Sequence, residues 1–277
     1  MQQLSLGYSP CPNDTFIFYG LIHGKVACPD TTFEERLEDV ETLNKLALQG
    51  ELDLTKISYH ALGHLRDEYS LLRSGGALGR GCGPLVIAPR ETNMAQLRGK
   101  KIAIPGTLTT ANLLLQLYGT GYEDLLVLPF HEIMPALLAG KADAGVIIHE
   151  SRFTYQLHGL KQVLDLGQWW EEDSGCPIPL GGILAKRSLG AEKIKQIDTA
   201  LRASVKYAFA TPHEPEAYIK QHAQELADDV IRSHIELYVN DFSIDLGAEG
   251  IKAIETLFQR AEERGIIPKS EKSLFAE

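Results

Sequence analysis

Short apolar runs alternate with helix-length amphipathic segments along most of this chain, and this alternation limits its fold more than any other feature. The runs of strand length cover residues 4–8, 52–57, 83–88, 101–104, 125–128, 144–148 and 182–185. The predicted helices between them cover residues 15–23, 40–49, 60–66, 109–118 and 132–138, and Asn13 or Asp14 is placed to cap the first of these. Strands that alternate with helices in this way predict an α/β fold with mostly parallel sheets.

The chain beyond residue 186 lacks strand-length runs, and its apolar residues have helical spacing instead. One amphipathic helix is expected around residues 194–205, and two more at 217–226 and 248–264. Because a helical block without strands does not easily form a domain, we expect it to pack back on the first sheet. The predicted architecture therefore has two lobes with a ligand cleft between them. Residues 1–90 and 183–277 form the larger, discontinuous lobe, and residues 91–182 form the smaller, inserted lobe.

Charge and cysteine content exclude several classes of protein. The 277 residues include 27 Lys and Arg against 37 Asp and Glu, a formal net charge of −10, which argues against binding to nucleic acid or an anionic membrane surface. The first residues, MQQLSLGYSPCPND, lack the cationic and apolar regions of a secretory signal, so we expect a cytoplasmic protein. Its four cysteines are scattered singly, a pattern that predicts reduced thiols and no metal site.

The segment at 106–111, GTLTTA, is a turn that runs into a predicted helix. The free N–H groups at a helix start, together with threonine hydroxyls, can bind an anion, and Thr110 and Ala111 would lie in the first turn. The alternative is that Thr109 simply caps the helix, which happens with or without a ligand. Spacing alone leaves both readings open.

Two further candidates stand where predicted strands end. His149 directly follows the run at 144–148, and ligands of open α/β sheets gather beyond the carboxyl ends of strands, where an imidazole can act as a general base. Lys56, Ile57 and Ser58 end another strand, and they offer a positive charge and a hydroxyl group. The alternatives are a histidine held by local hydrogen bonds and a serine that only caps the next helix.

Other motifs carry weaker signals. The turn at 9–14, SPCPND, is stiff enough to line a pocket, but Cys11 has no evident activating base. The glycines between residues 75 and 83 match no phosphate-binding motif and are interpreted as a turn or hinge loop. Trp169 and Trp170, followed by three acidic residues, are expected in a partly covered surface turn.

Several long motifs together resemble one family. They are SPCPNDTFIFY at 9–19, EDVETLN at 38–44, RSGGALGRGCGPLV at 73–86, IIHESRFTY at 147–155 and YVNDFSIDLG at 238–247. In these segments the chain resembles the 1,4-dihydroxy-6-naphthoate synthases of the futalosine route to menaquinone. The resemblance covers essentially the whole chain, and it implies the two-lobed fold of class II periplasmic binding proteins.

The resemblance also implies a reaction and a site. The enzyme would be a lyase that converts cyclic dehypoxanthine futalosine, a small carboxylate, to 1,4-dihydroxy-6-naphthoate and dihydroxyacetone, with no cofactor or metal. His149 would be the general base. The substrate would bind at Lys56, Ile57, Ser58, Thr110 and Ala111. We further expect the pocket to be lined by Ser9, Cys11, Asn13 and Asn44.

Two alternative functions stay open at this point. One is chorismate dehydratase, a sister activity of the same pathway on the same fold, against which the motifs around His149 and at 9–14 argue. The other is a solute-binding protein for small carboxylates that performs no catalysis, because a fold alone does not determine function. A secreted binder is expected to carry a leader segment, which the first residues do not resemble.

Overall fold

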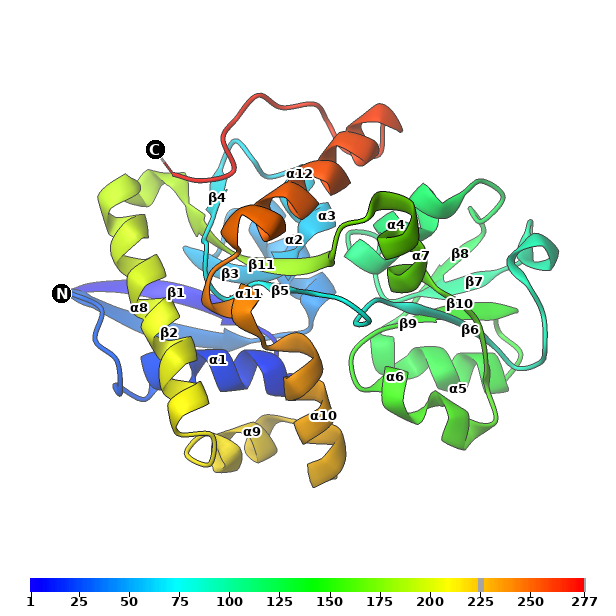
Figure 1. Ribbon diagram of the computed structural model, residues 1–277, viewed down its shortest axis with the longest axis horizontal. Coiled ribbons are helices and arrows are strands. Elements are labelled where there is room, and N and C mark those ends of the chain that lie inside the picture. Colours follow the sequence, from blue (N-terminus) through cyan, green and yellow to red (C-terminus); the bar gives the residue numbers. More distant parts are fainter. Residues whose placement is uncertain (224–226, 277) are drawn as a thin grey trace.

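The computed structural model describes residues 1–223 and 227–276, and it has two lobes that lie side by side, each built on its own sheet (Figure 1). The first sheet contains β1 (Gln2–Tyr8), β2 (Thr31–Leu37), β3 (Leu54–Ser58), β4 (Tyr69–Leu71), β5 (Ala77–Gly79) and β11 (Ile178–Lys186). The second contains β6 (Leu85–Ala88), β7 (Ile102–Ile104), β8 (Leu125–Val127), β9 (Ala144–Ile147) and β10 (Lys161–Asp165). The chain thus passes into the second sheet after β5 and returns before β11. The lobe division expected at residues 90 and 183 stays a prediction.

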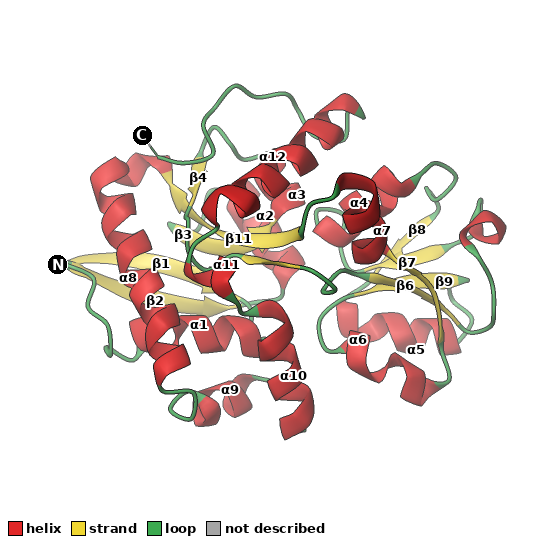
Figure 2. Ribbon diagram, viewed as in Figure 1, coloured by secondary structure: helices red, strands yellow, loops and turns green. Residues whose placement is uncertain are grey.

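Helices flank both sheets (Figure 2). The first lobe carries α1 (Pro12–Ile22), α2 (Val40–Leu48), α3 (Tyr59–Gly63), α8 (Ala191–Ala210), α9 (Glu216–His222), α10 (Asp228–Tyr238), α11 (Asp241–Ile244) and α12 (Gly247–Glu263). The second lobe carries α4 (Thr110–Tyr118), α5 (Ile133–Leu138), α6 (Ser151–Thr154) and α7 (Leu166–Ser174). The chain after β11 packs on the first lobe, as the sequence predicted. Across all described helices, none is long and apolar enough to cross a bilayer.

Both sheets are mixed, so the prediction of mostly parallel sheets is wrong. β1 runs parallel to β2 and β3, and β7 runs parallel to β8 and β9. In contrast, β11 is antiparallel to β3, β4 and β5, and β6 is antiparallel to β9 and β10. The physical reason is the crossing between lobes. Because β6 and β11 enter their sheets from the cleft, they run against the strands that end there.

Several local predictions also need correction. Helix α1 begins at Pro12, three residues earlier than expected, since proline is well suited to a first helical position, and Cys11 occupies the N-cap. Neither Asn13 nor Asp14 caps this helix; both side chains are buried within its first turn. The sequence also missed β2, β10 and α10. The helix expected at 217–226 ends at His222, and residues 224–226 lie outside the described residues.

The tryptophan pair lies in a helix and not in a surface turn. Trp170 is fully buried in α7, where its indole N–H donates to the carbonyl of Pro177 at 3.1 Å. Part of the glycine cluster forms β5, and Gly83 touches α7 at the crossing: a Cβ atom there would lie 2.2 Å from the Cα of Gly167. Because the backbone of Gly167 cannot move away from a Cβ atom, position 83 requires glycine.

One buried histidine joins the two lobes beside the cleft. The ring Nδ1 of His60, in α3, lies 3.2 Å from the carbonyl oxygen of Thr109, which precedes α4. His60 is 4% exposed, and burial lowers its pKa to about 4, against a weaker upward effect of the Thr109 hydrogen bond. The folded state therefore favours the neutral ring.

This histidine is expected to make the protein sensitive to acid. Because the folded pKa of His60 lies below its unfolded value of about 6.5, its contribution to stability is complete above pH 6.5 and is lost as the pH falls towards 4. The loss amounts to about 3 kcal/mol. We expect His60→Asn, which retains a donor for Thr109 but does not titrate, to flatten the decline in urea-unfolding free energy between pH 7 and 4. The exposed His213→Asn is the control, and parallel curves for His60→Asn and the wild type would contradict this assignment.

Candidate active site between the lobes

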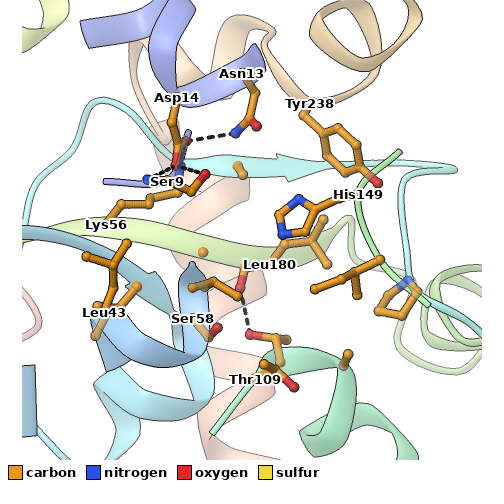
Figure 3. A pocket seen from close by; sticks show the side chains of 18 of the residues that line it. Ser9, Asn13, Asp14, Leu43, Lys56, Ser58, Thr109, His149, Leu180 and Tyr238 are labelled. Carbon is orange, nitrogen blue, oxygen red and sulfur yellow. Dashed lines mark hydrogen bonds and ion pairs between the residues drawn. The ribbon is translucent and has the colours of Figure 1, made fainter. Parts of the chain in front are cut away.

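A pocket lies between the lobes, where β1, β3 and β9 end and β6 and β11 begin (Figure 3). The lining residues are Ser9, Asn13, Asp14, Val40, Leu43, Lys56, Ile57, Ser58, Ala77, Cys82, Pro84, Thr109, Thr110, Ala111, Ile148, His149, Leu180, Gly181 and Tyr238. The wall combines apolar surface with polar and charged side chains, which suits a ligand with one charged end and a hydrophobic body.

The structure brings most of the sequence-predicted site residues to this one pocket. Those in its wall are Ser9, Asn13, Lys56, Ile57, Ser58, Thr110, Ala111 and His149. Cys11 and Asn44 lie behind the wall. Asn44 acts on the wall indirectly, through Ser58. Segments far apart in the sequence, from both lobes, thus line the same pocket.

Lys56 does not stand alone. Its ammonium Nζ lies 2.9 Å from Oδ1 of Asp14 and 3.3 Å from the carbonyl oxygen of Gly75. The other carboxylate oxygen of Asp14 accepts hydrogen bonds from the backbone N–H and the hydroxyl of Ser9, at 3.2 and 2.9 Å. Both charged side chains are buried. The positive charge at the end of β3 is therefore balanced within the protein before any ligand binds.

Ser58 is oriented by Asn44. The backbone N–H of Ser58 donates to Oδ1 of Asn44 at 2.9 Å, and the Asn44 amide donates to the Ser58 hydroxyl oxygen at 3.2 Å. Because that oxygen already accepts a hydrogen bond, its own proton is directed elsewhere. The Ser58 hydroxyl can therefore donate into the pocket. Its side chain makes no capping bond to α3, which it precedes.

The start of α4 has a side-chain cap and also backbone N–H groups that find no acceptor within the helix. Thr109 caps it, accepting from the N–H of Asn112 at 3.3 Å, so the capping alternative describes this residue correctly. The N–H groups of Thr110 and Ala111, which precede Asn112, have no acceptor within the helix. The hydroxyl of Thr110 donates to the carbonyl of Leu180 at 2.6 Å and so ties the helix start to β11. Both residues line the pocket, so the start of the helix, with the positive end of its dipole, lies at the pocket wall.

The loop before α4 is also tied to the first lobe. The carboxylate of Glu41, in α2, accepts from the N–H groups of Thr107 and Leu108 at 2.9 and 3.2 Å. A Cβ atom on Gly106 would lie 2.4 Å from this carboxylate, so the loop passes very close to it. Glu41 therefore holds the lobes together on one side of the cleft.

His149 lies in the wall of the pocket, directly beyond β9, and is half-buried (Figure 3). Its backbone has φ of +56°, a left-handed conformation that is uncommon for a residue with a side chain. Phe130 touches the ring edge to face at 4.9 Å between centroids, and the ring of His234 lies parallel at 6.0 Å. Burial lowers the pKa of His149, while the nearby carboxylates of Glu150 and Asp14 act in the opposite direction. A neutral imidazole at this place can accept a proton from a ligand.

Cys11 is an unsuitable nucleophile. Its thiol is buried, and burial raises its pKa well above the usual value. The sulfur lies within 4.8 Å of a ring nitrogen of His149 and a carboxylate oxygen of Glu150. Since the thiolate is the reactive form, a raised pKa keeps this cysteine inert.

Sequence reasoning missed four polar residues in or behind the wall: Asp14, Glu150, His234 and Tyr238. Asp14, Glu150 and Tyr238 lie within motifs that carried the family resemblance, so a signal for them existed. His234 is fully buried in α10, a helix that the sequence did not predict. No pattern in the sequence relates it to His149, because only the fold brings the two rings together.

Comparisons with known proteins agree with this architecture. A family model described as menaquinone biosynthesis matches residues 4–263. Two curated relatives are both named 1,4-dihydroxy-6-naphthoate synthase. The one from Thermus thermophilus is 54% identical over 275 residues, covering 99% of this chain and 100% of the relative. The one from Streptomyces coelicolor is 48% identical over 273 residues, covering 96% and 95%.

Solved structures show the same fold. A protein from Archaeoglobus fulgidus is 37% identical, with a TM-score of 0.90 over 96% of this chain and 98% of that chain. The alkanesulfonate-binding protein SsuA from Xanthomonas axonopodis pv. citri is 17% identical, with a TM-score of 0.71 over 96% and 94%. This second likeness concerns the fold alone. The prediction of a two-lobed fold like that of periplasmic binding proteins is confirmed.

Proposed function

The chain belongs to the menaquinone biosynthesis family, and we propose that it is a carbon–carbon lyase that converts cyclic dehypoxanthine futalosine to 1,4-dihydroxy-6-naphthoate and dihydroxyacetone. One observation carries this proposal: the imidazole of His149, directly after β9, and the start of α4 both line one pocket. The imidazole is suited to removing a proton, and the N–H groups at the helix start are suited to binding a carboxylate.

His149 is the proposed general base. Aromatisation requires removal of a proton from carbon next to an activating group, and burial keeps the His149 ring in the neutral form that accepts it. The carboxylates of Glu150 and Asp14 favour the imidazolium that forms. Closure of the lobes excludes water and fixes the orientation of the substrate, which can supply several kcal/mol of barrier reduction.

The substrate carboxylate is proposed to bind at the start of α4. The N–H groups of Thr110 and Ala111 donate to it, and the hydroxyl of Ser58 supplies a further hydrogen bond from the opposite lobe. Lys56 adds its positive charge at longer range, although Asp14 balances that charge. The remaining wall contacts the apolar part of the substrate.

The Thr110→Val variant tests this carboxylate site. It preserves the shape of the side chain but removes the hydroxyl that ties the helix start to Leu180. We expect KM to rise about tenfold and kcat to stay within about twofold, because one hydrogen bond that positions the amides is worth about 1–1.5 kcal/mol. Thr199→Val is a matched control, since the exposed Thr199 hydroxyl donates to the carbonyl of Lys195 within α8, outside the pocket wall. An unchanged KM in Thr110→Val would remove Thr110 from the site.

The function itself is tested by incubating the purified protein with cyclic dehypoxanthine futalosine and following the appearance of the naphthoate by chromatography. We expect stoichiometric naphthoate and dihydroxyacetone. Binding without product would favour a solute-binding protein. Dehydration of chorismate in a parallel incubation would favour the sister activity.

The same proposal includes the setting of the reaction. We propose that the enzyme works in the cytoplasm on a small-molecule carboxylate, without nucleic acid, membrane, metal or organic cofactor. The proposed steps move protons and cleave carbon bonds, for which acid–base side chains suffice. Turnover that persists unchanged after dialysis against a chelator would support the part of the proposal that concerns metals.

A further inference from the structure

Two buried polar atoms face each other across the lobe interface directly behind His149. They are Nδ1 of His234, from the first lobe, and Oε2 of Glu150, from the second, and they lie 3.9 Å apart. The side chains are 1% and 9% exposed. Neither atom has a hydrogen-bond partner among the described residues, 1–223 and 227–276. Leaving two such atoms unpaired is unfavourable, and the gap is about 1 Å too long for a hydrogen bond.

His234 is held rigidly on its other side. Its Nε2 lies 2.9 Å from Oδ1 of Asn13, whose amide nitrogen donates to Oδ1 of Asp14 at 2.8 Å. The same Asp14 oxygen is paired with Lys56 at 2.9 Å. Since the carboxylate fixes the orientation of the Asn13 amide, Oδ1 is the acceptor and Nε2 of His234 must carry the proton. In the neutral ring, Nδ1 then presents a lone pair towards Glu150.

Glu150 is the residue next to His149, so its position affects the base directly. The carboxylate is buried at the start of α6, and it favours the protonated form of His149. His149 itself has a strained backbone, with φ of +56°. Strained conformations persist only where the surrounding structure holds them. A bond from Glu150 to the opposite lobe would supply such a constraint.

We propose that Glu150 and His234 are positioning residues, which share one proton in a hydrogen bond when the lobes close over the substrate and thereby fix the ring of His149. The proton comes from solvent, because two unprotonated acceptors cannot bond to each other. The bond closes a continuous chain from Lys56 through Asp14, Asn13 and His234 to Glu150, across both lobes. The parallel rings of His234 and His149 then limit the tilt of the base. This inference rests on the proposed role of His149.

Single variants separate positioning from charge. Glu150→Ala and His234→Phe each remove the bond, and we expect each to lower kcat at least tenfold with little change in KM. Glu150→Gln should retain more activity than Glu150→Ala, because its amide N–H can donate to Nδ1 of His234 without a shared proton. His213→Phe, on an exposed histidine, is the control.

The pH profile gives a readout that a merely structural role would not move. The groups facing His149 are Glu150 beside it, Asp14 and Cys11 of α1, Lys56 of β3, His234 of α10 and, farther away, Asp39 before α2. Removing the Glu150 charge disfavours the imidazolium. The acid limb of kcat/KM is therefore expected at lower pH in both Glu150 variants than in the wild type.

The double variant Glu150→Ala with His234→Phe decides whether the two residues act as a pair. We expect its kcat to fall no further than that of the worse single variant, since either change already breaks the bond. If the losses in kcat of the two single variants multiply in the double variant, the inference is overturned. It is also overturned if the acid limb of kcat/KM does not move in the Glu150 variants. In both cases wild-type turnover still supports the proposed function. If the wild type forms no naphthoate, the proposed function fails and this inference fails with it. Thermal unfolding of each variant identifies losses that are due to misfolding.

Discussion

His149→Ala is expected to reduce naphthoate formation by about 10²- to 10⁴-fold while preserving the fold and at least part of the substrate affinity. The side chain lies in the pocket wall, where its ring packs with Phe130 and His234 but makes no hydrogen bond with the described residues. Removing it therefore deletes the base and leaves the amides of Thr110 and Ala111 in place. Single-turnover rates at saturating substrate measure the effect.

The control for this variant is His213→Ala, which changes an exposed histidine far from the pocket. Binding is measured separately by calorimetry, so that a loss of affinity is not mistaken for a loss of chemistry. Full turnover in His149→Ala would exclude the general-base assignment. Loss of binding together with turnover would instead make His149 a contact for the substrate.

The pH dependence of the wild type provides a second test of the same base. Catalysis requires the neutral ring, so activity is lost as the pH falls through the pKa of His149. Burial lowers that pKa below its ordinary value of about 6.5. The acid limb of kcat/KM is thus expected below pH 6.5, and a limb above that value would contradict the burial argument.

The location of the site was predictable from the sequence because the apolar runs indicate where the strands end. Each candidate segment directly follows a run of apolar residues or a turn, and parallel strands place their carboxyl ends at one edge of a sheet. That rule brought Ser9 and Ser58 together at the edge of the first sheet, and the expected cleft between two lobes added His149 from the second. The direction of β6 and β11 was not predictable in this way, since apolar runs do not show from which lobe a strand enters its sheet.

The charge pairs in the site could not be predicted from the sequence. Lys56 read alone is a free cation, yet in the fold it is neutralised by Asp14, 42 residues away. His234 lies in a helix whose first turn is acidic and whose pattern we did not recognise. Partners of this kind depend on packing between distant helices, which no local spacing encodes. The resemblance to a known family identified the base but not the groups behind it.

Lys56→Met is expected to lower the free energy of unfolding by about 3–5 kcal/mol, because it leaves the Asp14 carboxylate buried without its counter-charge. The double variant Asp14→Asn with Lys56→Met removes both charges and should recover most of that loss. Urea unfolding at pH 7 measures both values. Equal destabilisation of the single and double variants would show that the ion pair itself, and not the unpaired carboxylate, sets the stability.

The double variant also separates the two roles of Lys56. If the lysine serves only to neutralise Asp14, restoring stability should restore KM as well. If its ammonium also attracts the substrate carboxylate, KM stays raised in a protein that is stably folded. We expect the second result with a modest rise of about two- to fivefold, since Asp14 and Gly75 already occupy the ammonium and the amides of Thr110 and Ala111 hold the carboxylate directly. The chain's net charge of −10 is then compatible with an anionic substrate, because local donors and not the overall field bind it.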